Sequence, residues 1–178
     1  MGSGSGTSCS ITLNTKLTAE QRERYQNQDV IGKILRECGT VALVGLSSDT
    51  QKASYFVASY LAYEGYDIVP VNPRGGEILG KKVWADLEEI PFHVDLVVAF
   101  RPAEECEQLS VKAVKIGAKA FWMQLRIVNF KAADYALGAG LDVIMDKCVK
   151  MEHGRYAGSL HWAGMNTEIV SARKQKRN

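Results

Sequence analysis

Five short apolar runs recur between residues 40 and 146, and four of them contain β-branched side chains. They are TVALVGL (40–46), YDIVPVN (66–72), VDLVVAF (94–100), AKAFWMQL (118–125) and LDVIMD (141–146). Continuous apolar runs of this length are typical of parallel strands that are covered on both faces. The pattern therefore predicts a mainly parallel sheet of about five strands.

The segments between these runs change to a helical period. Apolar side chains recur three or four positions apart in 53–65, 104–117 and 129–140. An extra N-terminal helix is predicted where Thr18 and Gln21 form a T-x-x-Q capping box ahead of an apolar stripe at 31–38. Strands that alternate with helices form right-handed crossovers in a parallel sheet. The predicted fold class is α/β, a three-layer, doubly wound, Rossmann-like sheet.

The length and composition of the chain are those of one globular domain. The 178 residues are 46% hydrophobic, with a net charge of +2. We expect a flexible, Gly/Ser-rich tail at 1–16, a single domain at 17–170 and a basic tail at 171–178. No apolar run approaches the roughly 20 residues of a membrane span, and no signal-peptide pattern is present. Four scattered cysteines without metal-ligand spacing favour a reducing, cytoplasmic setting.

In a doubly wound sheet, ligands bind in the loops at the carboxyl ends of the strands. The first of these loops, GLSSDTQKAS, begins at Gly45, which permits a tight turn. Its serines and Lys52 precede a predicted helix, whose N-terminus attracts anions. Asp49 is expected to cap that helix. The loop therefore predicts a phosphate site.

The loop does not match the two best-known phosphate motifs. A dinucleotide fingerprint requires G-x-G-x-x-G and an acid after the second strand, but one glycine of three is present and the second strand ends in Asn72, Pro73 and Arg74. A Walker A loop is absent as well. Arg74 is a cation that can grip a phosphate through a fork of hydrogen bonds. An extra ribose phosphate, as in coenzyme A or NADP, suits this charge.

The third and fourth loops offer apolar walls. Phe100 and Arg101 follow the third strand, with Arg101 expected to reach toward the ligand, while Pro102 starts the next helix. The fourth loop brings Trp122 and Gln124, and Trp122 fits either an apolar wall or the core. A channel of this kind suits a ligand that has a polar head and a long, weakly polar arm.

Taken together, these segments resemble the small stand-alone CoA-binding-domain proteins. Those proteins are similar to the CoA-binding domain of the succinyl-CoA synthetase alpha subunit. The resemblance runs collinearly over about 40–155, from VALVGLSSDTQKASYFVASYL through GYDIVPVNP and IGAKAFWMQLRIVN to AGLDVIMDKCVKMEH. It implies a cytoplasmic, Rossmann-like protein that binds coenzyme A. Family members commonly carry glycine where this chain has Arg126, a cation that either adds a phosphate contact or crowds the arm.

The resemblance implies a set of cofactor-binding residues, position by position. The turn after the first strand holds the phosphates, the residues after the second strand line the adenosine and 3′-phosphate, and the others border the pantetheine arm. The set is Gly45, Leu46, Ser47, Ser48, Lys52, Ser54, Asn72, Pro73, Arg74, Phe100, Arg101, Trp122, Gln124 and Leu125.

No catalytic constellation is evident from the sequence. Cys148, beside Asp146 and Lys147, is either an activated thiol or a structural one. The predicted function is therefore a non-catalytic CoA or acyl-CoA binding or regulatory module. Two alternatives stay open: an NAD(P)-binding redox regulator, or an enzyme that acts on an acyl-CoA thioester. The expected partners are the small molecule and a protein partner or second copy of the chain, with nucleic acid and membrane disfavoured.

Overall fold

The computed structural model describes residues 17–156. The predicted tails at 1–16 and 171–178, and the end of the predicted domain at 157–170, lie outside the described residues. The helices are α1 (Ala19–Tyr25), α2 (Gln28–Glu37), α3 (Ala53–Tyr63), α4 (Cys106–Lys115), α5 (Phe130–Gly138) and α6 (Val149–Tyr156), with short 3₁₀ turns η1 (Leu87–Glu89) and η2 (Ala103–Glu105). The strands are β1 (Thr40–Val44), β2 (Asp67–Val71), β3 (Glu77–Ile78), β4 (Lys81–Lys82), β5 (Leu96–Ala99), β6 (Ala120–Met123) and β7 (Asp142–Ile144).

Five parallel strands form the central sheet, in the order β2-β1-β5-β6-β7. Counted along the chain this order is 2-1-3-4-5, the flavodoxin-like variant of the doubly wound sheet. Each sheet strand lies within the range of a predicted apolar run, so the sequence prediction is confirmed. The chain reverses direction across the sheet between β1 and β5, which makes that boundary the topological switch point.

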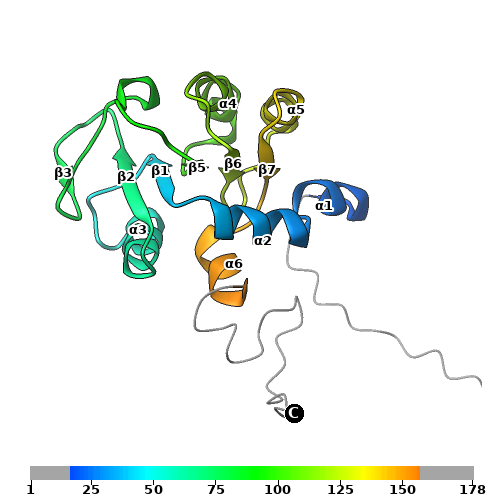
Figure 1. Cartoon of the computed structure of the whole chain (residues 1–178), viewed down its shortest axis with the longest axis horizontal. Coiled ribbons are helices and arrows are strands. Elements are labelled where there is room, and N and C mark those ends of the chain that lie inside the picture. Colours follow the sequence, from blue (N-terminus) through cyan, green and yellow to red (C-terminus); the bar gives the residue numbers. More distant parts are fainter. Residues whose placement is uncertain (1–16, 157–178) are drawn as a thin grey trace, which may run out of the picture.

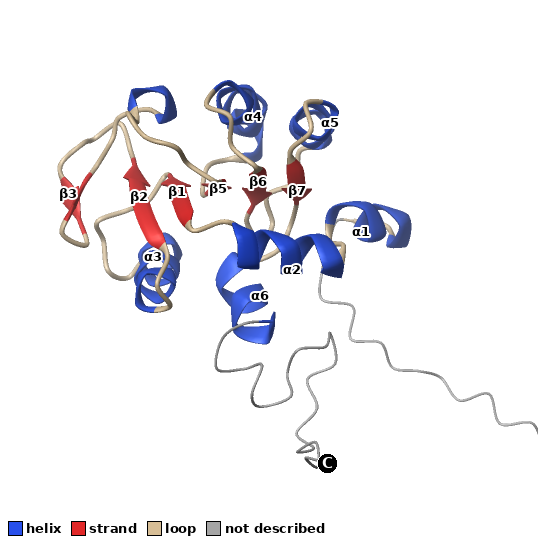
Figure 2. Ribbon diagram, in the orientation of Figure 1, coloured by secondary structure: helices blue, strands red, loops and turns tan. Residues whose placement is uncertain are grey.

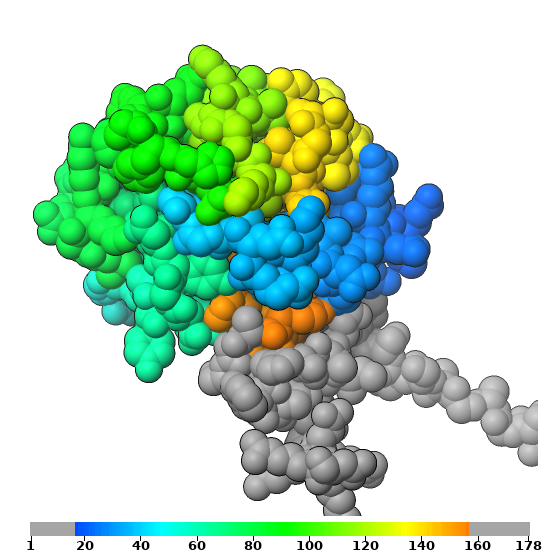
Figure 3. Space-filling model, in the orientation of Figure 1, coloured from blue at the N-terminus to red at the C-terminus, as the bar shows by residue number. Residues whose placement is uncertain are grey.

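Helices cover both faces of the sheet (Figure 1, Figure 2). On one face α4 and α5 bury the side chains of Ala42, Val97 and Phe121. On the other face α2, α3 and α6 bury the alternate positions, which include Leu43 and Val98. Successive strand residues point to opposite faces, so each strand contributes to both cores. Figure 3 shows the described residues as one closely packed body.

The N-terminal helical region differs from the single helix that the sequence predicted. The capping box of Thr18 and Gln21 is present and starts α1. Asn27 then starts a second helix, because its side chain accepts hydrogen bonds from the amides of Asp29 and Val30. α1 packs at the β7 side of the sheet, where Tyr25 donates a hydrogen bond to Asp134 of α5.

Two further elements were not predicted. One is the hairpin of β3 and β4, whose strands are two residues long and too short to give an apolar alternation. The other is α6, which carries several charged residues and has only a weak apolar stripe. Within residues 17–156, no helix combines the length and the apolar character that crossing a bilayer requires.

Candidate functional site

The loops after β1 and β5 meet at the switch point, and Gly45 lies at their junction. Its φ is +87°, a left-handed conformation that glycine adopts without strain. Its amide donates to the carbonyl oxygen of Val71 at 2.8 Å. A Cβ at this position would lie 2.7 Å from the carbonyl oxygen of Phe100 and 2.7 Å from Cδ of Arg101. The structure therefore requires glycine here for its conformation and for the close approach of the β5 loop.

The β1 loop is organised by its own side chains and leads into α3. The amide of Ser47 donates to the hydroxyl of Ser54, which is itself buried. The predicted cap at Asp49 is wrong: Asp49 accepts from the amide of Gln51 and closes a turn, and the N-cap residue is Lys52, without a side-chain cap.

The absence of a side-chain cap leaves free donors at the start of α3. Within the described part of the chain, nothing accepts a hydrogen bond from the amides of Ala53 and Ser54. Ser48 and Lys52 are exposed beside them, while Leu46 is buried. Unpaired amides at a helix N-terminus, next to a lysine, favour an anion.

The β2 loop is joined to the β1 loop through Asn72. The Asn72 amide nitrogen donates to the carbonyl oxygen of Leu46 at 2.9 Å. Its side-chain oxygen accepts from the amide of Arg74 at 3.0 Å and closes the turn. Pro73 and Arg74 are exposed, and no ion pair within residues 17–156 involves Arg74. Two of the predicted regions therefore meet in space.

Arg101 in the β5 loop already has an anionic partner. Its Nε and Nη2 atoms each donate to Glu105 at 2.8 Å, and this paired hydrogen bond raises the pKa of Arg101. The aliphatic stem of Arg101 packs over Gly45. Phe100 beside it is half-buried. A phosphate would have to compete with Glu105 for this guanidinium, so a ligand contact by Arg101 stays a prediction.

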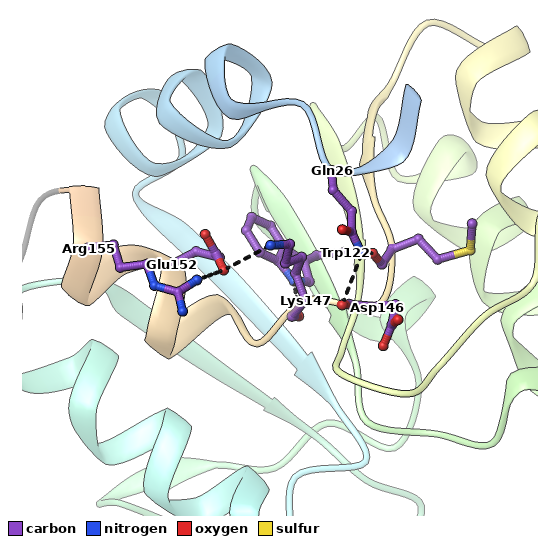
Figure 4. Close-up of polar contacts among 7 residues, drawn as sticks. Gln26, Trp122, Asp146, Lys147, Glu152 and Arg155 are labelled. Carbon is purple, nitrogen blue, oxygen red and sulfur yellow. Dashed lines mark hydrogen bonds and ion pairs between the residues drawn. The ribbon is translucent and has the colours of Figure 1, made fainter. Parts of the chain in front are cut away.

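The β6 loop separates its predicted residues into core and surface. Trp122 is fully buried, and its indole N–H donates to the carbonyl oxygen of Lys147 at 2.7 Å (Figure 4). Its side chain therefore packs in the core, which is one of the two interpretations that the sequence allowed. Gln124 is 4% exposed, and its Nε2 has no partner in the described structure. Leu125 is 53% exposed.

Comparison with known proteins identifies the family. Residues 39–154 match the family described as CoA binding domain. The chain belongs to this family. It is 36% identical over 123 residues to the uncharacterized protein YneT of Bacillus subtilis (strain 168). The match covers 69% of this chain and 91% of YneT. A hypothetical protein from Pyrococcus horikoshii OT3 has a similar structure, with a TM-score of 0.71, 34% identity, and coverage of 74% of this chain and 92% of that chain.

A more distant relative belongs to a larger enzyme. The alpha subunit of acetate–CoA ligase (ADP-forming) II from Pyrococcus furiosus is 35% identical over 89 residues. The match covers 46% of this chain and 20% of that subunit. The CoA binding domain thus occurs as a stand-alone chain in YneT and as one part of a ligase subunit.

This CoA binding domain has a strained residue at Arg126. Its φ is +69°, and its amide donates to Oδ1 of Asp146 at 2.6 Å. Asp146 also has a positive φ, +56°. A glycine would adopt the Arg126 conformation without strain, which gives a physical reason for the glycine expected at this position from the family resemblance.

The β7–α6 connection that supports Arg126 was missed by the sequence reasoning. Gln26 of the α1–α2 junction is buried, and its Nε2 donates to the carbonyl oxygens of Met145 and Asp146 at 3.0 and 3.2 Å (Figure 4). Glu152 of α6 is buried and forms ion pairs with Arg155 at 2.7 Å and Lys147 at 3.7 Å. Neither the glutamine nor the ion pairs stand out in the sequence, because the partners come from distant or weakly patterned segments.

The thiols of this CoA binding domain differ in their surroundings. Burial raises the pKa of Cys38 to about 11 and that of Cys106 to about 12, so both stay protonated at neutral pH. Cys148 is half-buried against the core formed with α2, α3 and α6. Among residues 17–156, no group of three or more His, Cys, Asp or Glu side chains is arranged to hold a metal ion.

Proposed function

We propose that this protein binds coenzyme A or acyl-CoA at the carboxyl edge of β1, β2, β5 and β6 and acts as a binding or regulatory module. The observation that carries this proposal is the hydrogen bond from Asn72 to Leu46, which joins the two loops that bear the phosphate-binding groups. It brings the loop of Arg74 against the loop that leads to the open N-terminus of α3. One ligand with two separate phosphate groups fits such an arrangement.

The charges divide naturally between the two phosphate regions of coenzyme A. The free amides of Ala53 and Ser54, with Ser48 and Lys52, suit the pyrophosphate. Arg74 has no ion pair within residues 17–156 and suits the 3′-phosphate, with Asn72 and Pro73 beside the adenosine. The pantetheine arm then passes Phe100 and reaches Gln124 and Leu125.

Two observations favour this proposal over the alternatives. NAD binding calls for an acid near the end of the second strand to hold the ribose hydroxyls, whereas β2 is followed by Asn72, Pro73 and Arg74. An enzyme that acts on the thioester needs an activated nucleophile. Burial keeps two of the three thiols in the described residues, those of Cys38 and Cys106, protonated, so Cys148 is the thiol to test. A cytoplasmic location and a protein partner or homodimer remain predictions.

Isothermal titration calorimetry with coenzyme A, 3′-dephospho-CoA, NAD and NADP tests the proposal. The wild-type protein should prefer coenzyme A. Arg74→Ala should weaken coenzyme A binding by about tenfold or more, the typical effect of losing a charge-assisted hydrogen bond, and should leave dephospho-CoA within about twofold. The matched control is Arg36→Ala. Arg36 is exposed in the last turn of α2, which leads to the start of β1 and so lies at the edge of the sheet opposite the proposed site.

The same titrations can contradict the proposal in separate ways. Tighter binding of NAD or NADP than of coenzyme A would replace it with the redox-regulator alternative. Equal losses for coenzyme A and dephospho-CoA in Arg74→Ala would reject the 3′-phosphate contact alone. Turnover of an acyl-CoA thioester by the purified protein, abolished in Cys148→Ser, would establish an enzyme in place of a binding module.

A further inference from the structure

Residues 124–126, which directly follow β6, combine three features in adjacent positions that bear on ligand binding. Gln124 is a buried amide whose Nε2 has no partner within residues 17–156. Leu125 is a large apolar side chain that is 53% exposed. Arg126 is an exposed, non-glycine residue at φ +69°. A buried donor without a partner and backbone strain each cost stability, and here they lie on either side of an exposed leucine.

The strain at Arg126 is held in place by the surrounding structure. The amide of Arg126 is bonded to the carboxylate of Asp146, a second residue with positive φ. The backbone of Asp146 is in turn fixed by the side chain of Gln26 (Figure 4). The next carbonyl, that of Lys147, accepts from the buried indole of Trp122. Strained residues that are fixed in this way cluster at ligand clamps.

The order of the strands indicates which part of coenzyme A would lie near residues 124–126. The adenosine side of the proposed site lies at β2, the pyrophosphate side at β1, and β5 and β6 follow in that direction across the sheet. A ligand laid over these strand ends reaches the β6 loop with its sulfur end. Residues 124–126 therefore lie where an acyl group attached to the sulfur would extend.

The chemistry of the three residues suits an acyl group that has a carbonyl, methylene groups and a terminal carboxylate. The unpaired amide of Gln124 is a donor for a carbonyl oxygen, and Leu125 offers apolar contact to methylene groups. Arg126 has no ion pair within the described residues, and a guanidinium binds a carboxylate through two parallel hydrogen bonds. We propose that residues 124–126 select acyl-CoA molecules whose acyl group ends in a carboxylate, with Arg126 as the residue that binds it.

This inference rests on the proposed binding of coenzyme A, and calorimetry can test the two separately. Succinyl-CoA and butyryl-CoA are a matched pair, since both acyl chains have four carbons and only one ends in a carboxylate. The wild-type protein should bind succinyl-CoA about tenfold or more tightly than butyryl-CoA, and the preference should shrink as the salt concentration rises.

Three variants separate the charge of Arg126 from its backbone conformation. Arg126→Gln keeps a long side chain at the same positive φ but removes the charge, so it should reduce the preference to about twofold or less. Arg126→Lys should retain part of the preference, because the charge remains while the fork is lost. Arg36→Gln removes an equal charge on α2 and should leave the preference unchanged. Free coenzyme A should bind all four proteins within about twofold.

Each other outcome overturns the inference in a recognisable way. Equal binding of succinyl-CoA and butyryl-CoA by the wild-type protein rejects acyl selection while leaving coenzyme A binding intact. An equal loss for free coenzyme A and succinyl-CoA in Arg126→Gln reassigns Arg126 to a phosphate contact. Failure of the wild-type protein to bind free coenzyme A or either acyl-CoA rejects the proposed function, and the inference with it.

Discussion

Replacing Gly45 by alanine tests the packing of the switch point, because a methyl group there meets two obstacles. The first is the positive φ of +87°, which costs an L-residue about 1–2 kcal/mol. The second is the contact of 2.7 Å with the Phe100 carbonyl oxygen, a backbone atom that cannot rotate away as a side chain would. Overpacking of this kind costs about 1–3 kcal/mol. Gly45→Ala should therefore lower the free energy of unfolding by about 2–5 kcal/mol.

Gly65 provides a matched control for this substitution. Its φ is +97°, close to that of Gly45, but a Cβ there would have no neighbour within 4 Å. Gly65→Ala should cost only the conformational part, about 1–2 kcal/mol. Urea denaturation of both variants, followed by circular dichroism, gives the difference. Equal losses for the two variants would refute the close approach of the β1 and β5 loops.

Two further substitutions probe buried polar groups. Gln124→Leu removes a buried donor without a partner, so it should raise the free energy of unfolding by about 1–3 kcal/mol and weaken the binding of acyl-CoA; a loss of stability would contradict this. His153 lies buried with Nδ1 3.0 Å from the Tyr60 hydroxyl, and burial lowers its pKa, so the unfolded chain binds the proton more readily. Stability measured by denaturation should therefore fall as the pH drops below about 6.5, and His153→Gln should flatten this dependence between about pH 7.5 and pH 5.5. An unchanged pH profile in the variant would assign the dependence to other groups.

The sheet could be predicted from the sequence because its strands are buried on both faces. A continuous apolar run such as that of β5 predicts a strand that is buried on both faces. The helical stripes between the runs predict the crossovers that connect parallel strands. The break between α1 and α2 was missed although Asn27 is a good N-cap residue, because the apolar stripe at 31–38 was read as a continuation of the first helix. The β3–β4 hairpin has no periodicity that a sequence can reveal.

The site was predictable as a set of loops, but its internal contacts were not. Strand order and the carboxyl-edge rule placed the four loops together. The pairing of Arg101 with Glu105 and the burial of Trp122 depend on side-chain directions that a linear pattern does not contain. The support of Arg126 by Asp146 joins segments 20 residues apart and required the structure.

Amide chemical shifts of the ¹⁵N-labelled wild-type protein, followed during a titration with coenzyme A, would locate the bound ligand on the sheet. We predict saturable shifts at the start of α3 and in the loops after β1, β2 and β6, including the amides of Ser47, Arg74 and Arg126. The cavity at the opposite edge of the sheet, lined in part by Lys33 and Asp142, should show no shifts. Shifts confined to that opposite edge, or no binding of coenzyme A, would contradict the account.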